Sequence, residues 1–242
     1  MNRDSEIYYE TYFDLVKTND LRNQFNSSLK SYLHKLNEYP ILEIGGGVGV
    51  DTISIASTGK RICCVEKEIF IIRLLNKRVI ESNEINSTNL QIEFIQQEFP
   101  YINLSESYYS CIILSNLLHF FDNATIIKSI DISKKLASVG GLIHIKTHSI
   151  NHPFNIKKQH SDVFKNYFDK NRLKSLFPPI DFDIIHLSED VYVPTDIDMK
   201  IKLEWIKRYR DEIDPKSSFE DLLKQNPIDD PEVSINLIAI KK

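Results

Sequence analysis

The chain has 242 residues, of which 42% are hydrophobic and 26% are charged, a length and composition that suit one α/β domain with a single large core. Its formal net charge at pH 7 is −4. Such a charge provides no overall positive potential for phosphate backbones, which disfavours a nucleic-acid partner and favours a small-molecule substrate.

The sequence shows neither a membrane span nor a secretory signal. No segment approaches the roughly 20 consecutive apolar residues that a membrane-spanning helix needs. Residues 1–6 are mostly polar and lack the apolar part of a signal peptide. We therefore expect a cytoplasmic protein with no membrane partner, whose oligomeric state the sequence leaves open. Cys63, Cys64 and Cys111 lie in expected strands, which predicts buried reduced thiols rather than a disulfide or a metal site.

Patterns typical of helices and strands alternate along the chain. Residues 5–36 indicate two helices rich in polar and aromatic residues, before the first strand. The alternation that follows predicts parallel strands joined by crossover helices on both faces of a sheet. The expected elements are strands 41–44, 61–65, 92–96, 111–115 and 142–147, with helices 49–57, 68–84 and 122–137.

Glycines are concentrated directly after the first expected strand. Four of the seven, Gly45, Gly46, Gly47 and Gly49, fall within five residues, which indicates a turn that side chains would obstruct. A strand, a bare turn and a helix N-terminus form a nucleotide-binding unit in open α/β sheets. The spacing disfavours a dinucleotide, because the pattern Gly-x-Gly-x-x-Gly would need a glycine where Val50 stands.

Two acidic residues beside this turn narrow the ligand class. Glu43, two residues ahead of Gly45, would repel a pyrophosphate but suits a nucleoside that carries an ammonium and a sulfonium group. The second expected strand is followed by Glu66, 21 positions beyond Gly45. A carboxylate at the tip of that strand has two oxygens that match the two ribose hydroxyls. We therefore predict that Glu66 binds a ribose; the alternative is a solvated loop carboxylate.

The residues beside the glycine turn, and the order of the later segments, resemble class I S-adenosylmethionine-dependent methyltransferases of the small-molecule type. The resemblance rests on the motif Glu43-x-Gly45-x-Gly47-x-Gly49, on Glu66, and on residues 92–98, 110–121 and 136–145, which follow in that family's order. It implies S-adenosyl-L-methionine as the cofactor. The residues that it places at the cofactor are Glu43, Gly45, Gly46, Gly47, Gly49, Glu66, Lys67, Gln97, Glu98, Ser115 and Asn116.

The resemblance also implies the fold and its additions. We expect a Rossmann-like, doubly wound α/β fold with a mostly parallel seven-stranded sheet, in which residues 181–193 form the sixth strand and residues 234–241 the antiparallel last strand. The chain is then one methyltransferase domain, residues 1–242. Its parts are an N-terminal helical lid (1–38), the sheet core (39–193 and 233–242) and a helical insertion (194–232). Apolar residues in 196–213 fit a strand or a helix; we predict a helix there and a short one at 218–224.

Histidines near the ends of the central strands are the candidates for catalysis. Methyl transfer requires aligned reactants, and a hydroxyl acceptor also requires a base, for which histidine is suited near neutral pH. His148 follows the fifth strand and His119 the fourth, at the edge where open α/β sheets bind ligands. His144 lies inside the fifth strand and is expected in the core. No metal is expected, because no cysteine or carboxylate falls at metal-ligand spacing among the histidines.

Three further residues are predicted at the substrate or in a lid above it. His152 follows His148 by four residues, and Tyr8 and Tyr12 recur at helical spacing near the N-terminus. In small-molecule relatives such a helix often covers the cofactor, which would exclude water from the reaction. Packing of these tyrosines in the core is the alternative.

Together these features predict a methyltransferase that moves the methyl group of S-adenosylmethionine to an oxygen or nitrogen of a small-molecule acceptor. Leu117 and Leu118 stand in place of the Pro-Pro-aromatic sequence of relatives that methylate nucleic-acid bases or protein glutamine, which disfavours those substrates. The alternatives are a methyltransferase acting on protein or RNA, with the insertion as a docking element, and a non-catalytic S-adenosylmethionine-binding protein. A nicotinamide-dependent oxidoreductase is disfavoured by the glycine spacing.

Overall fold

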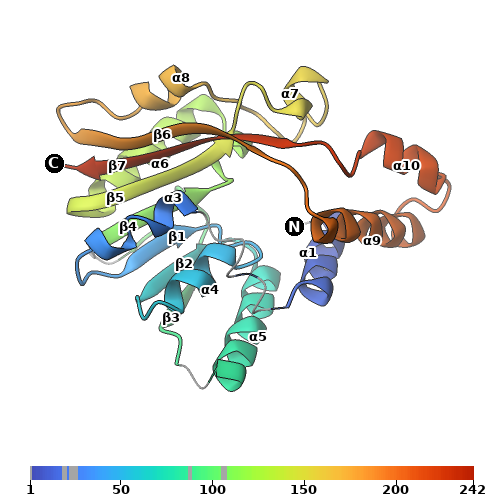
Figure 1. Cartoon of the computed structure of the whole chain (residues 1–242), viewed down its shortest axis with the longest axis horizontal. Coiled ribbons are helices and arrows are strands. Elements are labelled where there is room, and N and C mark those ends of the chain that lie inside the picture. The colour runs from blue at the N-terminus through green and yellow to red at the C-terminus, as the bar shows by residue number, and fades with distance from the viewer. Residues whose placement is uncertain (1, 18–20, 22–26, 87–88, 105–107) are drawn as a thin grey trace.

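A central sheet of seven strands organises the computed structural model, which describes residues 2–17, 21, 27–86, 89–104 and 108–242 (Figure 1). The strand order is β3-β2-β1-β4-β5-β7-β6. The strands are β1 (Ile41–Ile44), β2 (Ile62–Glu66), β3 (Ile92–Gln96), β4 (Tyr109–Ser115), β5 (Ala137–His148), β6 (Phe182–Tyr192) and β7 (Glu232–Lys241). The pairs among β1 to β5 are parallel, whereas β7 is antiparallel to both β5 and β6. The predicted Rossmann-like sheet with an antiparallel last strand is confirmed.

Helices cover both faces of this sheet because alternate residues of its buried strands point to opposite sides. Leu42 of β1 packs in one apolar cluster with Ile126 of α6, whereas Ile41 packs in another with Ile53 of α4. Cys63, Cys64 and Cys111 are buried in strands as free thiols, as expected. The crossover helices are α4 (Val50–Ala56), α5 (Ile69–Asn86) and α6 (Asn123–Leu136); shorter helices are α3 (Ser27–Lys30), η1 (Leu33–Lys35), η2 (Leu118–Phe120), α7 (Pro153–Ile156) and α8 (Lys170–Ser175).

The N-terminal region and the fifth strand differ from the sequence-based expectation. One long helix, α1 (Arg3–Leu15), opens the chain, and a single turn, α3, precedes the 3₁₀ turn η1. The expected second helix falls partly on residues 18–20 and 22–26, which lie outside the described residues. Strand β5 begins at Ala137, five residues earlier than expected, because Ala137 pairs with Tyr109 of β4 directly after α6 ends.

The insertion between β6 and β7 is helical, as predicted. It contains α9 (Asp196–Glu212) and α10 (Phe219–Gln225). Helix α9 starts in a capping box, in which the Thr195 hydroxyl accepts from the Asp198 amide while the Asp198 carboxylate accepts from the Thr195 amide. This local chemistry decides between the strand and helix patterns of the segment. Figure 1 shows α1, α9 and α10 beside the carboxyl ends of the parallel strands. Among the described helices, none is both long enough and apolar enough to cross a bilayer.

Candidate functional site

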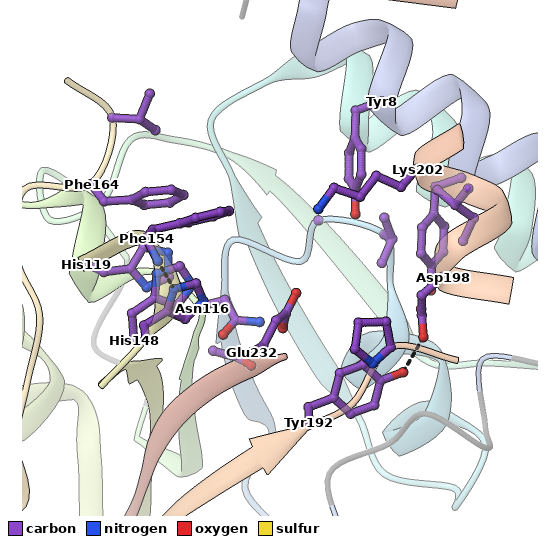
Figure 2. A pocket seen from close by; sticks show the side chains of 18 of the residues that line it. Tyr8, Asn116, His119, His148, Phe154, Phe164, Tyr192, Asp198, Lys202 and Glu232 are labelled. Carbon is purple, nitrogen blue, oxygen red and sulfur yellow. Dashed lines mark hydrogen bonds between the residues drawn. The ribbon is translucent and has the colours of Figure 1, made fainter. Parts of the chain in front are cut away.

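A cavity of about 620 Å³ opens at the carboxyl ends of β1, β4 and β5, with α1 and α9 forming its outer wall (Figure 2). The glycine turn after β1 forms its floor, and Ser115 and Asn116 line it where β4 ends. Asn116 has a left-handed backbone, with φ of +53°, and its amide donates to the carbonyl of Lys146 over 2.8 Å. A non-glycine residue in this conformation is uncommon and marks a position that the surrounding fold holds in place.

The turn after β1 requires residues without side chains for two different reasons. Gly45 and Gly47 have φ of +73° and +51°, the left-handed region that favours glycine, and both line the cavity. Gly46 has an ordinary φ, but a Cβ there would lie 2.4 Å from the Cys64 sulfur, so a side chain is excluded by the packing beneath. Gly49 lies outside the cavity lining and caps α4. The first three glycines therefore expose main chain to the cavity, and the fourth serves the fold.

Two carboxylates lie under this turn. Glu43 is only 3% exposed and accepts a short hydrogen bond from the Thr52 hydroxyl. Burial, followed by the negative charge of Asp51, raises the pKa of Glu43 well above its ordinary value. Burial also raises the pKa of Asp51, although Lys146 and a hydrogen bond with Ser115 oppose the rise. Two buried acids without a full counter-charge make this end of the cavity receptive to a cation.

Replacing Glu43 with glutamine is expected to stabilise the ligand-free protein. Because folding raises the pKa of Glu43, the stability that this carboxyl contributes is present below its unfolded pKa and is lost as pH rises through the folded value. At pH 8 the Glu43→Gln variant should unfold at a higher urea concentration than the wild type, since the amide can still accept from Thr52 and buries no charge. Urea unfolding at pH 8 measures this. The exposed Glu93→Gln variant is the control, and a loss of stability in Glu43→Gln would contradict the expectation.

The other predicted cofactor residues lie outside the cavity lining. Glu66, at the end of β2, is half-buried and accepts from the Glu68 amide over 3.1 Å and from the Gly47 amide. Its carboxylate is thus fixed beside the glycine turn. Lys67 and Glu98 pair with each other over 2.6 Å at the surface. The Gln97 side chain is bonded to the main chain of Asn103.

Tyr9 of α1 lies close to both the turn and Glu66. Its hydroxyl would be 3.9 Å from a Cβ on Gly47, and it lines the cavity. Burial, together with the neighbouring carboxylates of Glu66 and Glu68, raises the pKa of Tyr9 to about 12. The predicted lid residues Tyr8 and Tyr12, on the same helix, also line the cavity.

Three of the predicted histidines form one stack. The His119 and His148 rings lie 3.7 Å apart and 10° from parallel, and those of His148 and His152 lie 4.1 Å apart at 17°. Burial lowers the pKa of His119 to about 3 and that of His152 to about 4; it lowers the pKa of His148 further, as do the two neighbouring histidines. All three are therefore neutral at pH 7. His144 is fully buried in the sheet, as expected.

The contacts of the individual histidines indicate that the stacked rings line the cavity and do not take up protons near pH 7. His148 Nδ1 is buried and has no hydrogen-bond partner in the described structure. His152 Nδ1 accepts from the Phe154 amide over 3.2 Å and so caps α7. Neutral rings of low basicity are weak proton acceptors at pH 7. In the described part of the chain, no group of three or more side chains is placed to hold a metal ion.

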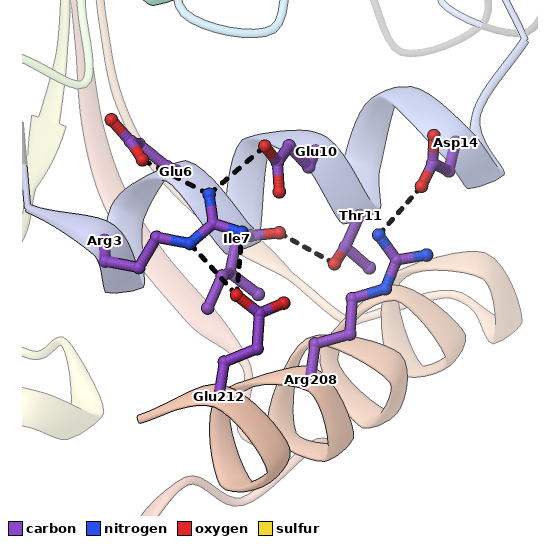
Figure 3. Close-up of polar contacts among 8 residues, drawn as sticks. All are labelled: Arg3, Glu6, Ile7, Glu10, Thr11, Asp14, Arg208 and Glu212. Carbon is purple, nitrogen blue, oxygen red and sulfur yellow. Dashed lines mark hydrogen bonds and ion pairs between the residues drawn. The ribbon is translucent and has the colours of Figure 1, made fainter. Parts of the chain in front are cut away.

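Polar contacts between residues 3–14 and residues 205–212 join helices α1 and α9 (Figure 3). Arg3 donates to Glu212 over 2.7 Å, and Arg208 donates to Asp14 over 2.8 Å. The Trp205 indole donates to Asp4 over 3.0 Å. Each ion pair is partly exposed and contributes little by itself, but together the contacts fix α9 against α1 above the cavity.

Several cavity residues were not predicted from the sequence. Asp51 could have been predicted from the sequence, since an acid in the first turn of the helix after a glycine turn faces any ligand held there. Lys202, from the insertion, and Glu232, at the start of β7, have no sequence feature that would have predicted their place in the cavity. Which of their neighbours face the cavity depends on how α9 packs against α1, and that contact joins segments about 200 residues apart.

Comparisons with known proteins identify the fold. No family model and no curated protein matches the sequence. The solved structure of TehB from Haemophilus influenzae is similar, with a TM-score of 0.62 and 17% identity over 90% of this chain; the match spans 63% of the TehB chain. Magnesium protoporphyrin IX methyltransferase from Synechocystis PCC 6803, solved with bound SAH, gives a TM-score of 0.60 and 12% identity over 91% of this chain and 83% of its own.

A SAM-dependent methyltransferase from Methanosarcina mazei gives a TM-score of 0.60 and 14% identity, over 90% of this chain and 98% of its own. The chain thus has the fold of class I S-adenosylmethionine-dependent methyltransferases.

Proposed function

We propose that this chain, as one domain of residues 1–242, is an S-adenosylmethionine-dependent methyltransferase that acts on an oxygen or nitrogen of a small-molecule acceptor. The observation that carries the proposal is the bare turn of Gly45 to Gly47 above two buried carboxylates, in a sheet of the methyltransferase topology. The same strand ends form a ligand crevice in open α/β sheets generally.

The residues at this edge fit the cofactor. S-adenosylmethionine supplies a methyl group activated by its sulfonium. Glu43 and Asp51, held at raised pKa, suit its ammonium and sulfonium charges, and the bare main chain of Gly45 and Gly47 permits close approach. We propose that Glu66 binds the ribose hydroxyls, with Gln97 and the Lys67–Glu98 pair beyond it at the adenine. Tyr9 lies beside Gly47 and Glu66, so its side chain would lie against a cofactor bound there or would have to move aside for it.

The enclosure of the cavity supports a small acceptor. Its volume of about 620 Å³ lies within the range of small-molecule sites, and α1 and α9 cover it from the outside. We propose that residues 1–38 and the insertion 194–232 act together as the lid, and that His119, His148 and His152 line the acceptor end. Their low basicity favours an acceptor that needs no strong base, such as an amine whose nitrogen is neutral at the moment of methyl transfer.

Isothermal titration with S-adenosylmethionine and its demethylated product tests the cofactor assignment. We expect micromolar binding, weakened about tenfold or more by Glu66→Ala, because one carboxylate would accept two ribose hydroxyls. The control is Glu38→Ala, which removes the same charge from an exposed residue before β1, at the opposite end of the strands. Absence of binding to the wild-type chain would refute the proposal. Equal affinity of the Glu66→Ala variant would refute the role of Glu66.

The acceptor class is tested separately. Purified protein is incubated with labelled S-adenosylmethionine and, in parallel, with a metabolite extract, total RNA or unfractionated lysate protein. Label in small-molecule products supports the proposal. Label confined to RNA or protein would show a macromolecular acceptor instead.

A further inference from the structure

The part of the cavity between β5, β7 and α9 holds several charged side chains. Among the lining residues there, three are carboxylates, Asp198, Asp230 and Glu232, and one is an ammonium, Lys202. Figure 2 shows Glu232 between the histidine stack on one side and Tyr192 and Lys202 on the other. Which of these charges is available to a ligand depends on what each already contacts.

Asp198 and Asp230 are committed to the fold. Asp198 accepts from the Thr195 amide over 2.8 Å and from the Tyr192 hydroxyl over 2.5 Å, which are contacts that begin α9. Asp230 forms an ion pair with Lys157 over 2.5 Å. A ligand would have to replace these contacts to bind either carboxylate.

Lys202 is likewise compensated. Its ammonium donates to the Pro227 carbonyl over 2.5 Å. Burial lowers the pKa of Lys202, while the nearby carboxylates of Asp230 and Glu232 raise it again. The Lys202 ammonium is therefore held by the Pro227 carbonyl and compensated chiefly by Asp230, which leaves little attraction for an anionic ligand.

Glu232 differs from the other three. It is exposed and lines the cavity, and its carboxylate makes no hydrogen bond or ion pair with another described residue, although it lies close enough to Lys202 to raise the pKa of that ammonium. It is the first residue of β7, paired with Tyr192 of β6, and two residues later Ser234 pairs with His148 of β5. Its carboxylate thus lies over the end of β5, away from the end of β2 where Glu66 is held. That places it on the acceptor side of the cavity.

An uncharged aromatic surface lies across the cavity from Glu232. Phe154 and Phe164 stack at 5.5 Å and 16°, and the His148 ring lies 4.9 Å from Phe164. The imidazoles here are neutral at pH 7, because burial lowers their pKa values. The faces of aromatic rings attract cations and stack with flat apolar groups.

We propose that Glu232 binds the methyl acceptor through an ammonium group of that acceptor, while Phe154, Phe164 and the histidine stack hold its ring or other apolar part. Before methyl transfer the ammonium gives one proton to the exposed Glu232 carboxylate or to water, and the neutral nitrogen then attacks the methyl group. The acceptor class is thus an amine with an aromatic or flat apolar body. This inference rests on the proposed function, because it assigns the acceptor end of the same cavity.

The test compares three probes with the same phenyl ring and different polar ends: 2-phenylethylamine, 2-phenylethanol and 3-phenylpropionate. Each is titrated calorimetrically into the full chain saturated with S-adenosylhomocysteine, at pH 7. The amine should bind about tenfold tighter than the alcohol or the acid. In Glu232→Gln that preference should vanish, with the affinity for the alcohol unchanged.

The matched control is Asp229→Asn, which removes a carboxylate three residues away that is exposed and does not line the cavity. It should retain the preference for the amine. Absence of amine binding at millimolar concentrations, tighter binding of the acid, or an unchanged preference in Glu232→Gln would each overturn the proposal. Titration of S-adenosylhomocysteine into each variant comes first, so a folding defect or failure of the cofactor assignment is seen before any probe is added.

Discussion

Replacing Gly49 with alanine is expected to lower the free energy of unfolding by about 2–5 kcal/mol. Gly49 caps α4 with φ of +86°, a conformation that costs an alanine roughly 1–2 kcal/mol. A Cβ there would also lie 2.6 Å from Leu75 Cδ2 and 3.6 Å from Ile53 Cγ1. Both side chains are fully buried, so the Leu75 methyl group has little free space into which it can move aside. Overpacking of this kind typically costs another 1–3 kcal/mol, roughly.

Gly59 provides a matched control for the backbone contribution. Its φ is +84°, nearly that of Gly49, but a Cβ there would have no neighbour within 4 Å. Gly59→Ala should therefore cost only the backbone contribution of about 1–2 kcal/mol, and the difference between the two variants isolates the steric contact with Leu75. The midpoints of urea unfolding at constant m-value give both numbers. Equal losses in the two variants would show that Leu75 does not restrict the residue at position 49.

Lowering the pH from 8 to 5 is expected to destabilise the protein through its buried histidines. His119 is 2% exposed, and burial lowers its pKa to about 3, against about 6.5 in the unfolded chain. Between these two values the unfolded state binds the additional proton, so the free energy of unfolding falls as pH falls below about 6.5. At pH 5 this amounts to about 2 kcal/mol for His119. Burial also lowers the pKa of His144 to about 3, which adds in the same direction.

A single-residue comparison separates the histidines from other titrating groups. In His119→Phe, the loss of stability between pH 8 and pH 5 should be smaller than in the wild type by about 2 kcal/mol. The buried acids Glu43 and Asp51 act in the opposite direction, but they are present in both proteins and cancel. His34→Gln is the control, since the exposed His34 is hydrated in both states. An unchanged pH dependence in His119→Phe would mean that this imidazole is protonated in the folded protein.

The order of the elements was predictable because each carries a local signal. The bounds of β1 and β3 match the expectation, since apolar runs bounded by turns fix short buried strands. Helix α9 was ambiguous by pattern and was decided correctly by the acidic residues of its first turn. The early start of β5 was missed, because the pairing of Ala137 with Tyr109 is a contact between strands and leaves no local trace.

Of the candidate site, the side formed by the glycine turn could be predicted from the sequence, whereas the arrangement of the opposite side could not. The glycine turn and Glu43 were found because backbone conformation and buried charge restrict residue types at fixed spacing. The stacking of His119 on His148 was not foreseen, although both were named, because the sequence does not show the orientation of two rings from different strands. Glu232 was missed altogether, since it looks like any other charged residue before a strand until β7 is seen beside β5.

The antiparallel pairing of Tyr192 with Glu232 has a practical consequence. The chain leaves the sheet after Tyr192 and returns at Glu232. The segment 193–231 could therefore be replaced by that of another protein while the strand order is kept. Helix α1 would have to be replaced together with it, because Arg3 and Asp4 of α1 are hydrogen-bonded to Glu212 and Trp205 of that segment. Chimaeras cut at these points would change the part of the cavity that holds Glu232 and Lys202 while the glycine turn and the ends of β1 and β2 are kept.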